Sequence, residues 1–147
     1  MGIYWRYKNS TSGFRSLVQL LETTPPIRRK KMIDAGMAED ASYTLRALEF
    51  VMEFKDLLGL PEEEMAEVIS NTPAQIAAYA LKDLNDQKKL EMILRCARPD
   101  HGSEIKIFME TEVPKNQILG AQLKMISIAR ELEQKGRLHV KEIPNAA

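Results

Sequence analysis

Apolar residues recur at three- and four-residue steps along most of this chain. The first such group is Phe14, Leu17, Val18 and Leu21, and similar groups follow up to about residue 132. This spacing places apolar side chains on one face of an α-helix. No run alternates β-branched with polar residues, and no Asn-Gly or Asp-Gly pair indicates a hairpin. The pattern therefore predicts an all-α fold.

Prolines, glycines and capping residues divide this pattern into about eight or nine short helices. The first is expected from Gly13 to about Thr23, with Ser12 as its N-cap. The second is expected to close at Gly36 and the third to run over 40–52.

The longest helix is expected over 114–136, because a proline stands at its first turn and a glycine just past its last. Before it, the Pro-Asp-His-Gly turn at 99–102 is expected to interrupt the chain. A shorter helix then follows with Ile105 and Phe108 on its apolar face.

These breaks predict four segments. Residues 1–12 are polar and aromatic and are expected to be a flexible leader. Residues 13–52 form a first helical segment, 53–143 a second helical domain, and 144–147 a tail.

Composition restricts the classes of function that this chain can have. The 147 residues carry 21 basic and 21 acidic side chains, and this balance argues against non-specific binding to nucleic acid. A single cysteine, Cys96, fits a reducing compartment, so a cytoplasmic location is expected. No apolar run approaches the roughly 20 residues that span a bilayer.

Candidate chemistry is sparse, so no enzyme, metal site or cofactor is expected. His101 and His139 lie too far apart in sequence for ligand spacing, and no phosphate-binding or nucleophile motif occurs. We expect His101 to be a solvated turn residue, although catalysis with Asp100 and Glu104 is a weaker alternative. His139 is expected to face solvent, and Cys96 to be a buried structural thiol.

Two runs of charged residues and one aromatic residue each allow more than one interpretation. The basic block 28–31 suits either a solvated helix face or a contact with an acidic partner or anionic lipid. The acidic block 62–64 matches the positive end of a helix dipole. Trp5 either anchors a partner or is mobile.

Several segments resemble the C-terminal region of the flagellar motor switch protein family FliG, and they occur in the family's order. Residues 13–21 (GFRSLVQLL) resemble its first armadillo helix, and 51–62 (VMEFKDLLGLPE) partly match its hinge and following helix. The family's ALKG appears as ALKD at 80–83. Its closing run, of the type AQ..I..IARRLEE.G.LV, appears over 121–140.

This resemblance implies a short armadillo-like, right-handed helical stack followed by a compact six-helix domain. It implies a hinge at Val51, Met52, Glu53 and Phe54. It also implies that an apolar face of the first segment stacks on a neighbouring subunit through Phe14, Leu17, Val18 and Leu21.

The resemblance further implies charged residues that engage the stator. Lys82, Arg98 and Lys115 fall at or near the family's basic positions. The family's acidic pair falls on Ile105 and Lys106, which removes or reverses that charge.

The expected function is therefore protein–protein interaction within a flagellar motor switch or rotor, in a divergent form with altered stator-contact charges. The alternative is an adaptor or regulatory paralog with no torque role. Expected partners are other flagellar switch or motor proteins, with self-association through residues 13–52. The expected location is cytoplasmic, with peripheral attachment to the inner membrane through partners.

Overall fold

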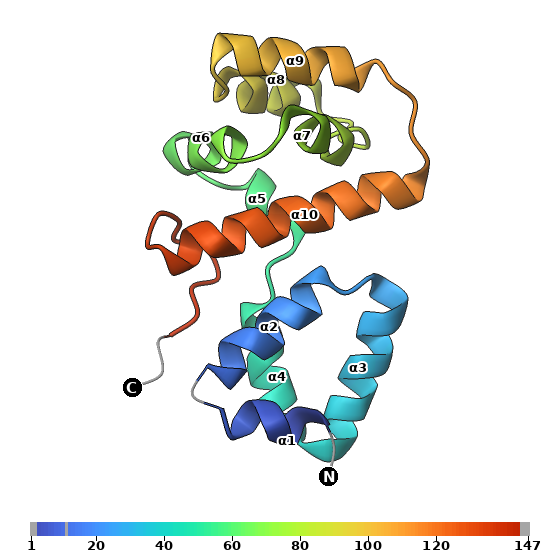
Figure 1. Ribbon diagram of the computed structural model, residues 1–147, viewed down its shortest axis with the longest axis vertical. Coiled ribbons are helices and arrows are strands. Elements are labelled where there is room, and N and C mark those ends of the chain that lie inside the picture. Colours follow the sequence, from blue (N-terminus) through green and yellow to red (C-terminus); the bar gives the residue numbers. More distant parts are fainter. Residues whose placement is uncertain (1–2, 11, 145–147) are drawn as a thin grey trace. The chain divides into compact units, whose positions relative to one another are not determined.

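The computed structural model describes residues 3–10 and 12–144. Within these ranges the chain forms α-helices and no strand, which confirms the predicted all-α fold. The helices fall into two compact units (Figure 1). The first holds the described residues up to Met52 together with those from Lys141 onward, and the second is Glu53–Val140.

The described residues of the first unit form four helices around a small apolar core. Leu17, Val18 and Leu21 on one face of its second helix are fully buried, and Ala47 and Val51 pack with them. Its helices are α1 (Ile3–Lys8), α2 (Gly13–Thr23), α3 (Pro26–Glu39) and α4 (Ala41–Phe50).

Helix α1 is part of this core, so the prediction of a flexible leader is wrong for its residues. Tyr4 is fully buried, and its hydroxyl donates a hydrogen bond of 2.7 Å to the carbonyl of Met32. Lys8 pairs with Asp40, which is also the N-cap of α4. Tyr7, one turn after Tyr4, is half-buried against the same core. Two contacts in six residues are too few for a helical pattern to be visible in the sequence.

Gly36 does not end its helix, contrary to the prediction. It is buried inside α3, where a Cβ would lie 2.2 Å from Tyr4 Cε2 and 2.5 Å from Thr44 Oγ1. The glycine is therefore required by the close approach of the Tyr4 ring, and the helix continues to Glu39.

Replacing Gly36 by alanine should therefore destabilise the first unit. The added methyl group displaces the Tyr4 ring, and such overpacking costs about 1–3 kcal/mol, more than the roughly 1 kcal/mol that alanine returns in helix propensity. Gly120 is the matched control, because it lies within a helix and a Cβ there meets nothing within 4 Å. Urea denaturation should give a lower free energy of unfolding for Gly36→Ala and a higher one for Gly120→Ala; the same sign for both would contradict this account.

The chain returns to the first unit at its C-terminal end. Ile143 is buried in that core, and Arg15 Nη2 donates a hydrogen bond of 3.0 Å to its carbonyl. The predicted boundary at residue 143 is therefore wrong: the second unit ends at Val140, and the residues that follow contribute to the first. One apolar residue between polar neighbours carries no sequence signal for such a contact.

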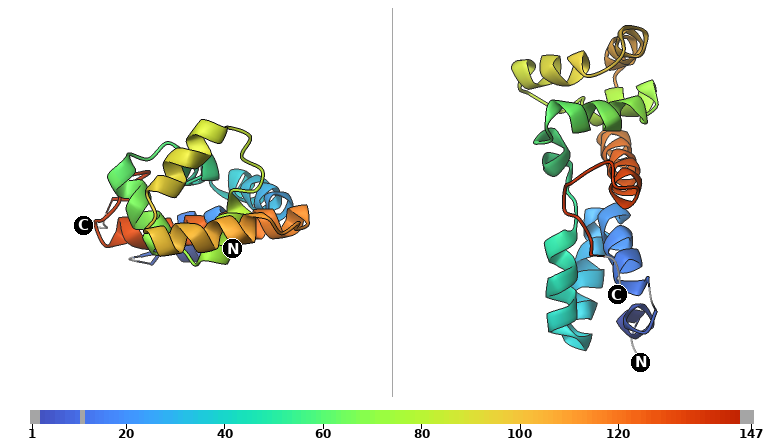
Figure 2. Two further views of the ribbon diagram at one scale, coloured as in Figure 1. Left: turned by 90° about the horizontal axis from the view of Figure 1, so that it is seen from above. Right: turned by 90° about the vertical axis from the view of Figure 1, so that its left-hand side faces the viewer.

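The second unit contains six helices in layers (Figures 1 and 2). Helix α7 packs against the long α10 on one side and against α9 on the other. The buried side chains of the second unit include Ile105 of α9 and Met125, Ile126 and Ala129 of α10. The helices are α5 (Phe54–Leu58), α6 (Glu62–Ser70), α7 (Ala74–Ala80), α8 (Gln87–Arg95), α9 (Pro99–Met109) and α10 (Lys115–Gln134).

The prediction for the longest helix is confirmed. Pro114 is its N-cap, and Gly136, two residues beyond its end, adopts a positive φ of 79° that favours glycine. By contrast, α9 begins at Pro99 rather than after Gly102, because a proline at the first helical position lacks only an N–H that would be unpaired anyway.

Polar side chains from elsewhere in the second unit hydrogen-bond to carbonyls at three helix C-termini. His101 of α9 reaches carbonyls at the end of α6, Gln122 of α10 reaches the carbonyl of Ala80 in α7, and Lys82 reaches that of Met109 in α9. Carbonyls in the last turn of a helix have no partner within the helix. These three contacts therefore join the layers of the unit at their polar ends.

Candidate partner-binding site

Helix α9 lies between two of the candidate charges, with Arg98 at its start and Lys82 at its end, and is held by a narrow buried face. Gly102 and Ile105 are buried, and Phe108 is half-buried. Arg98 precedes the helix in an extended conformation as its N-cap, which is the conformation expected before proline. The opposite face is left to solvent.

That exposed face combines acidic groups with one large apolar side chain. Asp100, Glu104 and Ile107 stand at positions i, i+4 and i+7, so they follow one line along the helix. Ile107 is 65% exposed. Lys106 is also exposed, to one side of this line. We call Asp100, Glu104 and Ile107 the α9 face.

Arg98 lies at the start of the α9 face. Its Nε is 3.8 Å from Asp100 Oδ1, and both side chains are at least three-quarters exposed. An ion pair so exposed contributes little to stability because water screens it. The guanidinium is therefore available to a partner.

Lys82 differs from the expectation for a stator contact. It is half-buried, and its ammonium donates a hydrogen bond to the carbonyl of Met109 at the end of α9. A cation there also complements the negative end of the helix dipole. Its position is thus explained by support of α9 within the unit.

Lys115 is the first residue of α10, where it is exposed and makes no hydrogen bond or ion pair with the described residues. The three predicted basic residues do not form one cluster. Arg98 and Lys82 contact opposite ends of α9, and a helix of 11 residues is about 16 Å long.

The acidic pair that the resemblance implies falls on one buried and one exposed position. Ile105 is fully buried in the second unit, so a carboxylate at that position would lack water. The neighbouring Lys106 is exposed. The acidic groups that reach the surface of α9 are instead Asp100 and Glu104, within the preceding turn and a half.

His101 is not a solvated turn residue, contrary to the prediction. It is half-buried on α9, and its Nε2 lies 3.1 Å from the carbonyl of Ile69 and 2.9 Å from that of Thr72. Because carbonyls only accept hydrogen bonds, Nε2 must carry the proton. No sequence signal links His101 to residues about 30 positions earlier.

His139 and Cys96 are closer to expectation. The His139 side chain is exposed as predicted, while its backbone N–H donates a hydrogen bond of 2.6 Å to Glu64 Oε1. The Cys96 thiol is only half-buried and donates to the carbonyl of Met92 at 3.3 Å. Burial, with a smaller effect of the Glu62 carboxylate, raises the pKa of this thiol above its usual value.

The predicted hinge spans the junction between the two units. Val51 and Met52 are buried in the first unit, and the Met52 N–H donates a hydrogen bond of 2.7 Å to the buried carboxylate of Glu22. Glu53 is exposed and starts α5 with a capping box to Asp56. Flexibility at this junction stays a prediction, and Met52 marks its anchored side.

The predicted stacking face is not available for stacking. Leu17, Val18 and Leu21 are fully buried within the first unit, and Phe14 packs edge-on against Tyr43 and Phe50. These residues are the core of their own unit. Leu17, Val18 and Leu21 have no surface left for a second subunit, and Phe14 keeps only part of its surface.

A site for metal or membrane insertion finds no support in the described part of the chain. Within residues 3–10 and 12–144, no group of three His, Cys, Asp or Glu side chains could hold a metal ion. No helix there has both the length and the apolar content needed to cross a bilayer.

The model of the FliG C-terminal domain family matches residues 37–140, which include all of the second unit and the hinge. The chain belongs to the FliG C-terminal domain family. A crystal structure of FliG residues 86–343 from H. pylori superposes with a TM-score of 0.61 at 17% sequence identity. A second H. pylori FliG structure, residues 116–343, gives a TM-score of 0.58 at 17% identity.

These superpositions cover 90% and 91% of this chain but only 63% and 59% of the two FliG chains. At this identity they establish a shared fold. No curated protein sequence matches the chain.

Proposed function

We propose that this FliG-family chain is a non-enzymatic interaction module of a flagellar motor switch or a related cytoplasmic assembly, and that the α9 face binds its partner. Support comes above all from the family match over residues 37–140, within which α9 presents Asp100, Glu104 and the exposed Ile107 along one line.

The composition of the α9 face suits a protein partner. Two carboxylates one turn apart provide charge complementarity, and Ile107 provides apolar area at their side. Interfaces commonly combine an apolar contact with charged groups that set orientation and association rate. Arg98 and Lys106 add cations at the edge, so a partner segment of mixed charge fits best.

The alternative is an adaptor or regulatory paralog without a torque role. Two features support it over a working rotor subunit: Ile105, where the resemblance implies acidic charge, is buried, and Lys82 donates a hydrogen bond to the carbonyl of Met109. Both reduce the set of free charges at the positions that resemble stator contacts.

Affinity capture from the native cell tests the proposed function. The tagged chain should co-purify with identified motor switch or stator proteins, and Asp100→Lys with Glu104→Lys should abolish this capture while circular dichroism shows an intact fold. Lys124→Glu, on the exposed side of α10, serves as a charge-changing control. Capture that persists in the double variant would refute the α9 face, and a complete absence of motor proteins would refute the functional class.

Swimming assays separate the two forms of the proposal. An adaptor predicts that deletion of the gene leaves swimming intact and alters motor assembly or switching. Rescue of a FliG deletion by this chain would instead assign it a rotor role.

A further inference from the structure

A groove opens between α8 and α9 in the second unit, with a volume of about 570 Å³. Its lining begins at Glu91 on α8 and ends at Lys106 on α9, and in the left view of Figure 2 these two helices diverge from the short connection that joins them. We call it the α8–α9 groove. Asp100, Glu104 and Ile107 of the α9 face do not line it, so it lies on another side of α9.

Three cationic side chains surround this groove: Arg95, Arg98 and Lys106. All three are exposed, and the side chains of Arg95 and Lys106 make no hydrogen bond or ion pair with a described residue. The second unit as a whole carries twelve basic and fifteen acidic residues, a formal net charge of −3. The groove therefore gathers cations in a unit that is acidic overall, and its local charge attracts an anion.

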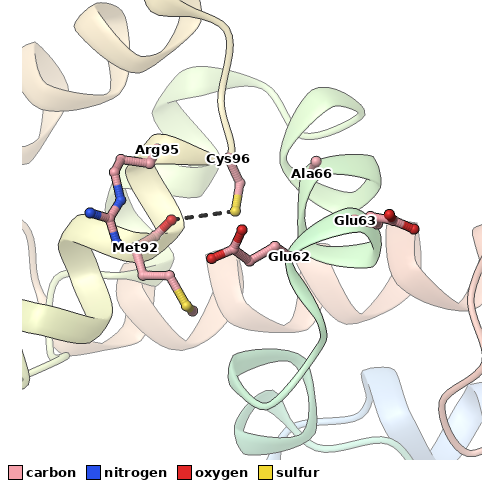
Figure 3. A pocket seen from close by; sticks show the side chains of 6 residues that line it. All are labelled: Glu62, Glu63, Ala66, Met92, Arg95 and Cys96. Atoms are coloured by element: carbon pink, nitrogen blue, oxygen red, sulfur yellow. Dashed lines mark hydrogen bonds between the residues drawn. The ribbon is translucent and has the colours of Figure 1, made fainter.

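Arg95 also borders a neighbouring groove between α6 and α8, whose acidic residues are Glu62 and Glu63 (Figure 3). Figure 3 shows the Glu62 carboxylate pointing toward the Cys96 thiol, while the Arg95 guanidinium extends away from both glutamates. These carboxylates thus leave Arg95 without an ion pair. Its guanidinium is available to a ligand in the α8–α9 groove.

The floor of the α8–α9 groove is apolar. Leu94 and Ala97 are half-buried there, and Gly102 is buried. A Cβ at Gly102 would lie 3.7 Å from both Ala97 Cβ and the carbonyl oxygen of Leu94, so the two segments approach closely at this point. Binding sites for small molecules commonly combine such an apolar surface with a few polar groups that fix orientation.

The cations select the chemistry of the anion. Guanidinium groups bind phosphate through two parallel hydrogen bonds, and a lysine ammonium binds it as a point charge. Arg98 and Lys106 stand eight residues apart, which is about 12 Å along a helix. A ligand that pairs with all three cations must therefore carry several negative charges spread over several ångströms, as a diphosphate or triphosphate does.

The single carboxylate of the groove favours an organic phosphate over an inorganic one. Glu91 is exposed at the edge, where its Oε1 accepts a hydrogen bond of 3.5 Å from Gln87 Nε2. A carboxylate repels a bare polyanion but accepts hydrogen bonds from hydroxyl groups. A sugar attached to the phosphates supplies such hydroxyls.

We infer that the α8–α9 groove binds a small organic polyphosphate of the class of the nucleoside diphosphates and triphosphates. Its volume lies within the range of about 300–1,000 Å³ that is common for small-molecule sites. A stable protein partner would instead need about 800 Å² of surface on each side. The inference goes beyond the proposed function, in which the α9 face contacts a protein.

Titration of the ¹⁵N-labelled full chain with ATP and GTP, followed by two-dimensional NMR, tests this inference. Amide shifts should concentrate in residues 91–106, and binding should weaken in high salt. Inorganic triphosphate, which lacks the sugar and the base, should bind about tenfold more weakly. Absence of binding at about 1 mM of either nucleotide would overturn the inference, as would equal affinity for inorganic triphosphate.

The double variant Arg95→Gln with Lys106→Gln should weaken ATP binding about tenfold or more, because it removes two charged donors. Lys88→Gln with Lys89→Gln is the matched control, since it removes the same charge at exposed positions of α8 that do not line the groove. It should bind ATP like the wild type. Equal loss in both double variants would indicate attraction by net charge and would refute the site.

An acidic peptide is the competing occupant. A glutamate-rich peptide with the same charge as ATP should bind more weakly than ATP, and a peptide that binds more tightly would overturn the assignment to a small molecule. Asp100→Lys with Glu104→Lys should still bind ATP, because neither residue lines the groove. Nucleotide binding by the purified chain and capture of motor proteins through the α9 face therefore succeed or fail separately.

Discussion

Replacing Ile105 by aspartate, which places a carboxylate where the resemblance to FliG implies acidic charge, is expected to destabilise the second unit by about 4 kcal/mol or more. Ile105 is fully buried, so the variant loses its apolar contacts and must bury a polar group without a prepared partner. Since domains have a total stability of about 5–15 kcal/mol, much of the margin is removed. Urea denaturation followed by circular dichroism measures the loss.

Lys106→Asp is the matched control, because it adds the same carboxylate one residue later at an exposed position. Its free energy of unfolding should stay within about 0.5 kcal/mol of the wild type. Trp5, the single tryptophan, lies in the first unit. Its fluorescence therefore follows the unfolding of the first unit, separately from the second unit that carries both substitutions. If Ile105→Asp were as stable as Lys106→Asp, the account of position 105 by burial would be wrong.

Arg130→Met is expected to cost about 3–5 kcal/mol, because it leaves a buried carboxylate without its cation. Arg130 Nη1 donates a hydrogen bond of 2.8 Å to Glu133 Oε1, and the two side chains are only 2% and 5% exposed. Thermal and urea unfolding of the second unit should both show the loss.

The double variant Arg130→Met with Glu133→Leu distinguishes the cost of leaving one buried charge without its partner from the cost of lost side-chain packing. Replacing a whole buried ion pair by apolar side chains of similar size is often neutral or stabilising. The double variant should therefore recover most of the stability lost by Arg130→Met. A double variant less stable than the single one would show that Arg130 acts through other contacts.

The resemblance to the family could be recognised from the sequence because its motifs lie in helices whose start, apolar face and end are each set by residues close together in the chain. Helix α10 begins after a proline, keeps its apolar face at helical spacing and closes before a glycine with positive φ, all within contacts of a few residues. The same reasoning identified α2 with its bounds. The fold class and these two helices could therefore be predicted, whereas the first turn of α9, which holds Asp100 of the candidate site, was predicted as a turn between helices.

The functional details were less accessible, because exposure depends on partners remote in sequence. Lys82 and Arg98 look alike as isolated cations, yet Lys82 is engaged by a carbonyl 27 residues later, and Arg98 remains at the surface. The apolar residues Leu17, Val18 and Leu21 suggested a stacking surface. They instead form a core, because α1, α4 and the segment around Ile143 cover them.

Local sequence was sufficient for the helical class, the long closing helix and the membership of a family, since helix periodicity and caps arise from residues at most four positions apart. Tertiary structure alone placed Tyr4 over Gly36, His101 at the end of α6 and Ile143 in the first unit. It also decided that Ile105 is buried while Asp100 and Glu104 face solvent. The physical reason is that burial is a property of packed neighbours, and those neighbours lie tens of residues away along the chain.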